Sequence, residues 1–174
     1  MIDETRAFIP VGIAILTISD TRTEETDTSG KILRDRASSA GHNIADHKIV
    51  KDEISAIQDQ IKSWTVNAAI QIIITTGGTG LTGRDITPEA LEPLFDKAIP
   101  GFGELFRMLS YETIGISTIQ SRCTAGITDG TLIFALPGST GACKDGWDKI
   151  LSGQLDSRWR PCNFIEMLPR YKES

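Results

Sequence analysis

The sequence contains no apolar segment long enough to cross a membrane. Its longest mostly apolar run covers only residues 11–18 and follows Asp3, Glu4 and Arg6. A membrane-spanning helix needs about 20 apolar residues, and a signal peptide carries basic residues ahead of its apolar region. The sequence therefore predicts a cytoplasmic protein without a membrane partner.

Cysteine and positive charge are also scarce. Cys123, Cys143 and Cys162 are widely spaced and form no Cys-x-x-Cys pair, so we expect reduced thiols rather than a disulfide framework or a zinc site. The 18 Lys and Arg residues are outnumbered by 23 Asp and Glu, for a formal net charge of −5. This charge opposes binding to nucleic acid, so an anionic ligand must be held by local donors.

Two common groups of catalytic and nucleotide-binding motifs are missing. No Gly-x-x-x-x-Gly-Lys-[Ser/Thr] sequence is present, and no Ser, His and Asp have the local context of a nucleophile elbow. Residues 78–83 match Gly-x-Gly-x-x-Gly, but residues 84–86 separate this run from the next predicted helix. Because a dinucleotide-binding helix begins within its glycine run, we do not interpret residues 78–83 as that motif.

The composition is that of one folded domain. Hydrophobic residues make up 40% of the 174 positions and charged residues 24%, and no linker, repeat or low-complexity tract divides the chain. We therefore expect a single domain over residues 1–174.

Four short apolar runs predict β-strands, at residues 11–18, 44–50, 70–75 and 131–136. Consecutive apolar residues indicate strands covered on both faces, as in the parallel sheets of α/β proteins. Helical spacing of apolar residues predicts helices between and after these strands, near 28–40, 53–66, 87–95, 101–111 and 140–151. The sequence thus predicts an α/β fold with a mostly parallel central sheet.

Capping signals mark two of these helices. Thr28 or Ser29 suits the N-cap of the first helix, and Gly41 suits a left-handed stop at its end. Thr87 predicts a hydroxyl cap immediately before Pro88.

Small and polar residues follow three of the predicted strands. The segments are SDTR at 19–22, TTGGTGLTGRD at 75–85 and PGSTG at 137–141. In open α/β sheets, ligands bind beyond the carboxyl ends of the strands. Glycine lets the backbone approach a ligand closely, and its N–H groups bind phosphate without added charge. We interpret these loops as a phosphate-binding site; the alternative for each loop alone is a simple turn.

Two aspartates occur at the same predicted edge of the sheet. Asp52 follows the second strand and Asp85 ends the glycine-rich loop. Paired carboxylates suit Mg²⁺, which proteins hold through a few carboxylates plus substrate phosphates. The alternative is that each aspartate caps a helix, which the residues alone favour for Asp52 and leave even for Asp85.

Several segments carry a family resemblance: TTGGTG at 75–80, RDITPEAL at 84–91, PGFGE at 100–104, SR at 121–122 and LPGS at 136–139, with DTSG at 27–30 and PCNF at 161–164. In the order and spacing of these segments, nearly the whole chain resembles the MoaB/Mog family of molybdenum cofactor biosynthesis proteins. Ser139 and Thr140 follow one branch of the family, whereas adenylylating members more often have another residue followed by Pro.

The resemblance implies a three-layer α/β/α sandwich of Rossmann-like topology, a homotrimer or homohexamer, and binding of molybdopterin. Adenylylating members transfer AMP from Mg-ATP to the terminal phosphate of molybdopterin and release pyrophosphate, and a molybdenum insertase uses the product. The alternatives are a non-catalytic molybdopterin-binding or carrier protein of the same pathway and a nucleotide-binding regulator. Phe102, Phe106 and Met108 also favour self-association, because they exceed what one helix face of a small monomer must bury.

The resemblance also implies roles for individual residues. Asp52 and Asp85 match the catalytic, Mg²⁺-binding aspartates of adenylylating members, which outweighs the capping alternative for Asp52. The expected nucleotide-binding residues are Thr76, Gly77, Gly78, Thr79, Gly80, Pro137, Gly138 and Ser139. The expected molybdopterin-binding residues are Ser19, Asp20, Thr28, Ser29, Ser121 and Arg122.

Overall fold

Strands with consecutive apolar residues form the centre of a six-stranded sheet in the computed structural model, which describes residues 1–173. The strand order is β2-β1-β3-β6-β5-β4. The strands are β1 (Gly12–Ile18), β2 (Asn43–Val50), β3 (Ile72–Thr76), β4 (Lys97–Ala98), β5 (Thr124–Thr128) and β6 (Thr131–Leu136). Strands β2, β1, β3 and β6 run parallel to one another, as the sequence predicts.

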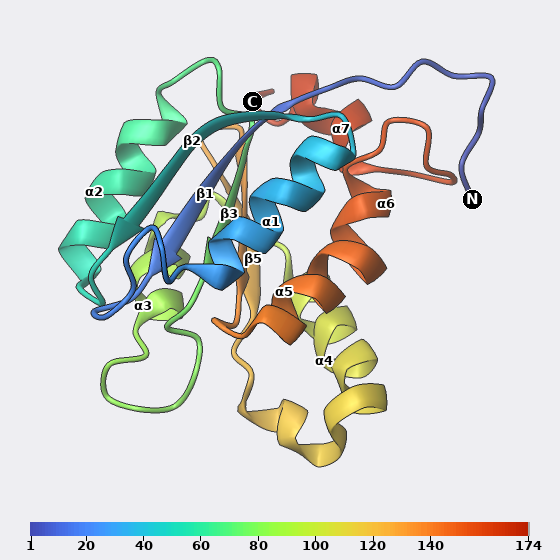
Figure 1. Cartoon of the computed structure of the whole chain (residues 1–174). Coiled ribbons are helices and arrows are strands. Elements are labelled where there is room, and N and C mark those ends of the chain that lie inside the picture. Colours follow the sequence, from blue (N-terminus) through green and yellow to red (C-terminus); the bar gives the residue numbers. More distant parts are fainter. Residues whose placement is uncertain (174) are drawn as a thin grey trace.

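Helices cover both faces of the sheet (Figure 1). They are α1 (Thr28–Ser39), α2 (Ile54–Thr65), α3 (Thr87–Leu91), α4 (Pro100–Ile114), α5 (Thr140–Gly146), α6 (Ser152–Gln154) and α7 (Phe164–Met167). Between α5 and α6 the chain makes a π-helical segment, η3 (Trp147–Leu151), and after α4 it makes a 3₁₀ segment, η2 (Gly115–Gln120). Helices α2 and α3 lie on one face and α1, α4, α5 and α6 on the other, which confirms the α/β/α sandwich.

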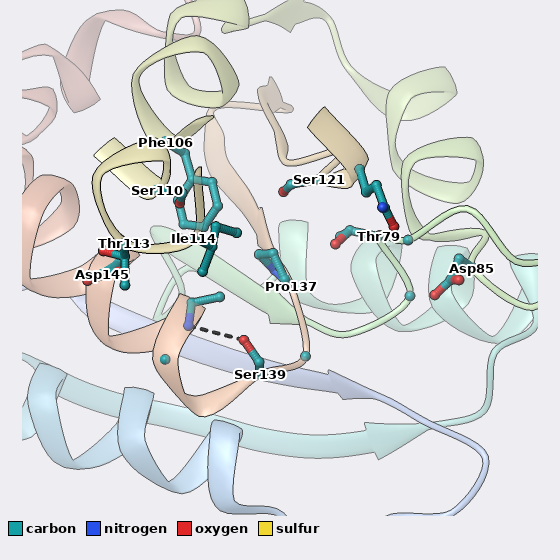
Figure 2. Close-up of a pocket in the computed structure, with 16 residues that line it drawn as sticks. Thr79, Asp85, Phe106, Ser110, Thr113, Ile114, Ser121, Pro137, Ser139 and Asp145 are labelled. Atoms are coloured by element: carbon teal, nitrogen blue, oxygen red, sulfur yellow. Dashed lines mark hydrogen bonds between the residues drawn. The ribbon is translucent and has the colours of Figure 1, made fainter. Parts of the chain in front are cut away.

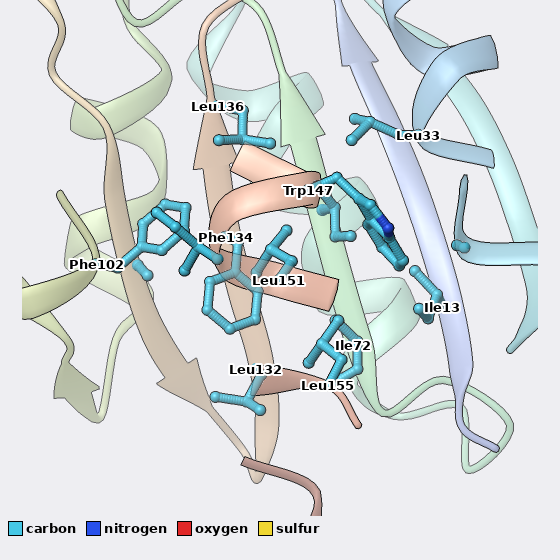
Figure 3. Close-up of a cluster of buried hydrophobic side chains, with 14 of the residues drawn as sticks. Ile13, Leu33, Ile72, Phe102, Leu132, Phe134, Leu136, Trp147, Leu151 and Leu155 are labelled. Atoms are coloured by element: carbon cyan, nitrogen blue, oxygen red, sulfur yellow. The ribbon is translucent and has the colours of Figure 1, made fainter. Parts of the chain in front are cut away.

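Each face of the sheet has its own apolar core. On the α1/α5 face, Phe134 of β6 contacts Phe102 of α4, with ring centroids 5.1 Å apart, and Trp147 is buried above the sheet (Figure 3). On the other face, Ile57 and Ile61 of α2 are fully buried in the cluster that contains Ile73 of β3. Burial on both faces explains why β3 and β6 are apolar at consecutive positions.

Strands β4 and β5 are absent from the sequence prediction. They are antiparallel additions at the β6 edge, and β5 pairs with β6 as a hairpin. The turn residues Asp129 and Gly130 have φ values of 48° and 76°. Asp-Gly is a strong sequence signal for a two-residue hairpin turn, because both positions need positive φ.

Two predicted helix caps are wrong, and one predicted stop is confirmed. Asp27, rather than Thr28 or Ser29, caps α1 by accepting a hydrogen bond from the N–H of Gly30. Thr87 is already inside α3, and its hydroxyl donates to the carbonyl oxygen of Gly77 at 2.8 Å. Gly41 has φ of +95°, the left-handed conformation expected after α1.

The structure also bears on membrane-spanning helices and on the three cysteines. Within residues 1–173, no helix is both long and apolar enough to cross a membrane. Cys123, Cys143 and Cys162 are free thiols, of which the first two are buried. Burial raises the pKa of Cys143 to about 11, so this thiol stays protonated and unreactive near neutral pH.

The exposed apolar residues that could drive self-association are not the ones that the sequence predicts. Phe102 and Phe106 are core residues, 4% and 3% exposed, and belong to the cluster around Phe134. Met108 is exposed, and the neighbouring η2 segment adds Ile116 and Ile119, which are 81% and 80% exposed. Contiguous exposed apolar residues of this kind mark association surfaces.

We expect this α4/η2 surface to hold a homotrimer or homohexamer together. Light scattering at micromolar concentration should give a mass of three or six chains, and the double variant Ile116→Asp, Ile119→Asp should shift it to one chain. Val66→Asp is the matched control, because Val66 is equally apolar and 78% exposed but lies at the end of α2. A wild-type monomer would contradict this expectation.

Candidate functional site

The carboxyl ends of β3 and β6 hold two glycine-rich loops side by side. The N–H of Gly77 donates to the carbonyl oxygen of Leu136 at 3.1 Å, and the hydroxyl of Thr76 donates to that of Pro137 at 3.0 Å. A Cβ added to Gly138 would lie 3.2 Å from the Cα of Gly77. The two loops therefore approach backbone to backbone.

The first turn of the β3 loop requires glycine at two successive positions. Gly77 and Gly78 have φ values of +108° and +64°. A Cβ on Gly77 would also lie 2.2 Å from the carbonyl oxygen of Ile18 at the end of β1. Side chains are thus excluded where the loop leaves the sheet, and the backbone of the loop faces the adjacent space.

These loops border a cavity of about 520 Å³ (Figure 2). Its other wall comes from α4, η2 and α5. The lining residues are Gly78, Thr79, Gly80, Asp85, Phe106, Ser110, Thr113, Ile114, Gln120, Ser121, Pro137, Gly138, Ser139, Gly141, Ala142 and Asp145. The volume is within the range of small-molecule and nucleotide sites.

Six of the predicted nucleotide-binding residues line this cavity: Gly78, Thr79, Gly80, Pro137, Gly138 and Ser139. Thr76 and Gly77 lie beneath it, where they are buried and make the bonds between the loops. The hydroxyl of Ser139 accepts a hydrogen bond from the N–H of Ala142 and caps α5.

Three strand ends meet at an acidic cluster beside the glycine loop. Asp20, after β1, accepts hydrogen bonds from the guanidinium of Arg84 at 2.9 and 2.5 Å and from the N–H of Asp52 at 3.3 Å. Burial raises the pKa of Asp52, and the carboxylates of Asp20 and Asp85 raise it further. Asp20, Asp52 and Asp85 are thus close enough for their charges to interact.

Neither Asp52 nor Asp85 caps a helix. The N-cap of α2 is Glu53 and the N-cap of α3 is Ile86, and neither helix has a side-chain cap. The carboxylate of Asp85 instead accepts from the N–H and the hydroxyl of Thr82, at 2.8 and 2.7 Å, and these bonds lower its pKa. Asp85 therefore stays ionised and closes the tip of the glycine-rich loop.

Arg122 fastens the other side of the same loop. Its guanidinium donates to the carbonyl oxygens of Gly80 and Asp85, at 2.8 and 2.6 Å, and forms an ion pair with Glu89. Arg122 does not line the cavity, whereas its neighbour Ser121 does. Its visible role is to hold the loop, and its predicted contact with molybdopterin stays a prediction.

Comparisons with known proteins identify the family. Residues 14–157 match the model of a family described as a probable molybdopterin binding domain. The chain belongs to this molybdopterin-binding domain family. Molybdenum cofactor biosynthesis protein B of Escherichia coli K12 is 57% identical over 157 residues, which cover 90% of this chain and 92% of that protein.

Solved structures of family members agree in fold. A crystal structure of a molybdenum cofactor biosynthesis protein B superposes with a TM-score of 0.84 at 43% identity, covering 86% of this chain and 94% of that one. The tungsten cofactor synthesizing protein MoaB from Pyrococcus furiosus gives a TM-score of 0.69 at 39% identity, covering 82% and 91%. The α/β fold and the MoaB/Mog resemblance predicted from the sequence are confirmed.

The residues that the family resemblance assigns to molybdopterin do not form one group. Ser121 lines the cavity, whereas Ser19, Asp20, Thr28 and Ser29 lie outside its lining. The hydroxyl of Ser19 accepts hydrogen bonds from the N–H groups of Thr21 and Arg22, at 3.2 Å each. Thr28 is exposed at the start of α1, while Ser29 is buried and donates to Asp27.

Asp27 is a buried anchor for this first turn of α1. Its carboxylate accepts from the hydroxyl of Thr17 at 2.6 Å and from the N–H of Gly30 at 2.9 Å, and it lies 3.0 Å from Nε2 of His47. Burial alone would raise the pKa of Asp27, but these partners lower it to about 2. Asp27 therefore fixes α1 to β1 and β2.

Sequence reasoning missed the helical wall of the cavity. The missed lining residues are Phe106, Ser110, Thr113, Ile114, Gln120, Gly141, Ala142 and Asp145. The sequence of α4 predicts an apolar helix and contains no binding motif, so no local pattern identifies its cavity-lining residues. Asp145 follows the PGSTG loop within the predicted helix, and that proximity was an available signal.

The acidic cluster has a donor set that fits Mg²⁺. The carboxylate of Asp52 is half-buried beside two other carboxylates and accepts no hydrogen bond from residues 1–173, so a cation would relieve its repulsion. In the described part of the chain, no three or more His, Cys, Asp or Glu side chains form a site that could hold a metal ion by themselves. Mg²⁺ does not need such a site, since substrate phosphates and water supply its other ligands.

Removing Arg122 tests its role in holding the loop. We expect Arg122→Ala to speed amide hydrogen exchange across residues 78–89 and to lower the free energy of unfolding by about 1–2 kcal/mol, because two carbonyl oxygens and Glu89 lose their donor. Arg170→Ala is the control, since the Arg170–Glu173 pair is exposed. Lost molybdopterin binding with unchanged exchange would instead assign Arg122 to the ligand.

The low pKa of Asp27 predicts acid sensitivity. The pKa of Asp27 is about 2 in the folded protein and near 3.9 in the unfolded chain. The ionised carboxylate therefore stabilises the fold above about pH 4, and this stabilisation is lost as the pH falls through 2. Asp27→Asn should lower the free energy of unfolding by about 2 kcal/mol at pH 7 and flatten its slope between pH 4 and 2. Asp35→Asn, on the exposed side of α1, is the control; equal slopes in wild type and Asp27→Asn would contradict the assignment.

Proposed function

We propose that this protein acts in molybdenum cofactor biosynthesis by transferring the adenylyl group of ATP to the terminal phosphate of molybdopterin. The phosphate oxygen of molybdopterin attacks the α-phosphorus of ATP, a new P–O–P bond forms, and pyrophosphate leaves. The family match supports the molybdopterin substrate. The observation that carries the chemistry is a cavity that two glycine-rich strand-end loops and Asp85 border together.

The lining of the cavity favours transfer between two bound phosphates. Its sixteen residues include no Cys, and its Ser and Thr hydroxyls have no His or Lys in the lining to activate them. A phosphate monoester is already anionic near neutral pH and needs no base to attack. Alignment of the two phosphates and stabilisation of developing charge are then the main requirements.

The chain's own groups divide this work by position. In the proposal, the backbone at Gly78, Thr79 and Gly80 binds the phosphates of ATP, with the facing loop at Gly138 and Ser139 closing the other side. Asp85 and Asp52 hold Mg²⁺ at the acidic edge. When bound there, Mg²⁺ neutralises charge on the triphosphate and on the pyrophosphate that leaves.

Ion pairing reduces the electrostatic repulsion between the acidic edge and ATP. Arg84 neutralises Asp20 and lowers the pKa of that carboxylate, whereas Asp52 and Asp85 form no ion pair with the described residues. A Mg-ATP complex brings a cation to this position, whereas free ATP brings only negative charge. We therefore expect ATP binding to require Mg²⁺.

One reaction separates this proposal from its alternatives. Purified protein with molybdopterin, ATP and Mg²⁺ should form adenylylated molybdopterin and one pyrophosphate per product. A carrier protein would bind molybdopterin without consuming ATP, and a nucleotide-binding regulator would bind ATP without needing molybdopterin. We further propose that the product passes to a molybdenum insertase.

The central variant is Asp85→Asn. The amide can still accept the bond from the N–H of Thr82 but lacks the charge that Mg²⁺ needs. We expect a folded protein that binds molybdopterin and forms adenylylated molybdopterin slower by a factor on the order of 10² or more. Asp52→Asn should behave alike, and the double variant should lose much less than the product of the two losses, because residues that serve one metal act together.

Stability measurements distinguish a metal-binding role from a structural one. In the absence of Mg²⁺, Asp52→Asn should not destabilise the fold, because it removes a charge that burial, Asp20 and Asp85 all disfavour. Asp59→Asn, on the exposed face of α2, is the control. Near wild-type product formation by Asp85→Asn at saturating Mg²⁺ and ATP would remove Asp85 from the mechanism.

A further inference from the structure

The two ends of the cavity differ in chemistry, and the proposed function accounts for only one of them (Figure 2). Asp85 and the backbone of Gly78, Thr79 and Gly80 form the first end. Figure 2 shows Asp145 and Thr113 at the opposite end, with Pro137 and Ser139 between. A ligand that spans the cavity therefore meets backbone donors at one end and a second carboxylate at the other.

The second end is unsuited to phosphate. It combines the apolar side chains of Phe106 and Ile114 with the carboxylate of Asp145, and it lacks the glycine-rich backbone that Gly78, Thr79 and Gly80 present at the first end. An aromatic ring and an aliphatic side chain suit the faces of a planar base. If the phosphates lie at the glycine loops, the nucleoside must lie against α4 and α5.

Ser110 presents an unused hydroxyl to this end. The residue is only 5% exposed, it lines the cavity, and its hydroxyl makes no hydrogen bond within residues 1–173. Because this hydroxyl lines the cavity and makes no hydrogen bond to the described residues, it is free to donate to or accept from a ligand group there.

Asp145 offers carboxylate oxygens to the same space. Its Oδ1 lies 3.2 Å from Nζ of Lys149 one helical turn later, and Lys149 does not line the cavity. The ion pair leaves Oδ2 without a hydrogen-bond partner among the described residues. An ionised carboxylate accepts hydrogen bonds only, and the vicinal 2′- and 3′-hydroxyls of a ribose are two adjacent donors.

We propose that Asp145 recognises the ribose diol of the nucleotide and that Ser110 contacts its base, so that the cavity selects ribonucleotides over 2′-deoxyribonucleotides. This inference rests on the proposed function, since it assigns the nucleoside end of the same ATP site. The selection operates on binding and precedes adenylyl transfer.

Calorimetric titration without molybdopterin tests the assignment. With Mg²⁺ present, wild type should bind ATP about tenfold more tightly than 2′-deoxy-ATP, the loss expected when a hydrogen bond to a charged group is removed. Asp145→Asn and Asp145→Ala should weaken ATP binding and bring the two affinities close together. Ser110→Ala should weaken both nucleotides by the same factor and keep their ratio.

The control variant and the nucleotide set keep the outcomes separate. Asp148→Asn is the matched control, because Asp148 lies on the same helical stretch but pairs with Arg36 outside the cavity. Equal wild-type affinities for ATP, 2′-deoxy-ATP and 3′-deoxy-ATP would overturn the ribose assignment even if no variant folds. An unchanged ratio in Asp145→Asn would also overturn it, while molybdopterin adenylylation still stood. Failure of wild type to bind any nucleotide would overturn the proposed function itself.

Discussion

The backbone contact between the ends of β3 and β6 is the constraint on which the site depends. Parallel pairing of the two strands continues past the sheet through the bond from Gly77 to Leu136 and the bond from Thr76 to Pro137. Because Thr76, Gly77 and Leu136 are buried, the two loops leave the sheet in a fixed relation. A side chain at Gly77 would strike the end of β1, so glycine there sets the position of the loop and hence of Asp85. The cavity is a consequence of strand pairing.

Electrostatics follow from the same placement. A chain with a net charge of −5 that binds anions must use neutral donors and locally balanced charge. Arg84 and Arg122 are both committed to the strand-end loops, the first to Asp20 and the second to loop carbonyl oxygens and Glu89. Neither guanidinium lines the cavity, so in the proposed function phosphate binding falls to the backbone, and a cation balances the carboxylates of Asp52 and Asp85.

How much could be predicted from the sequence depended on whether the signal was local. The parallel strands are marked by consecutive apolar residues, and the site residues at their ends follow directly from them. The β5–β6 hairpin was missed although Asp129-Gly130 is a local turn signal, because Thr124–Thr128 is not an apolar run. The cap of α1 was misplaced by one or two residues, since Asp27, Thr28 and Ser29 all suit the role and only burial against Thr17 and His47 decides between them.

The two walls of the cavity also differ in what determines them. The strand-end wall consists of backbone that the pairing of β3 and β6 holds in place. Backbone N–H groups bind phosphate, which every nucleotide carries. The helical wall is built from side chains of α4 and α5, two segments that tertiary packing brings together on one face of the sheet. In the proposed function, the strand-end wall binds the phosphates and the helical wall recognises the nucleoside. Substitutions at Ser110 or Asp145 should then change nucleoside recognition without disturbing the strand pairing that positions the phosphates.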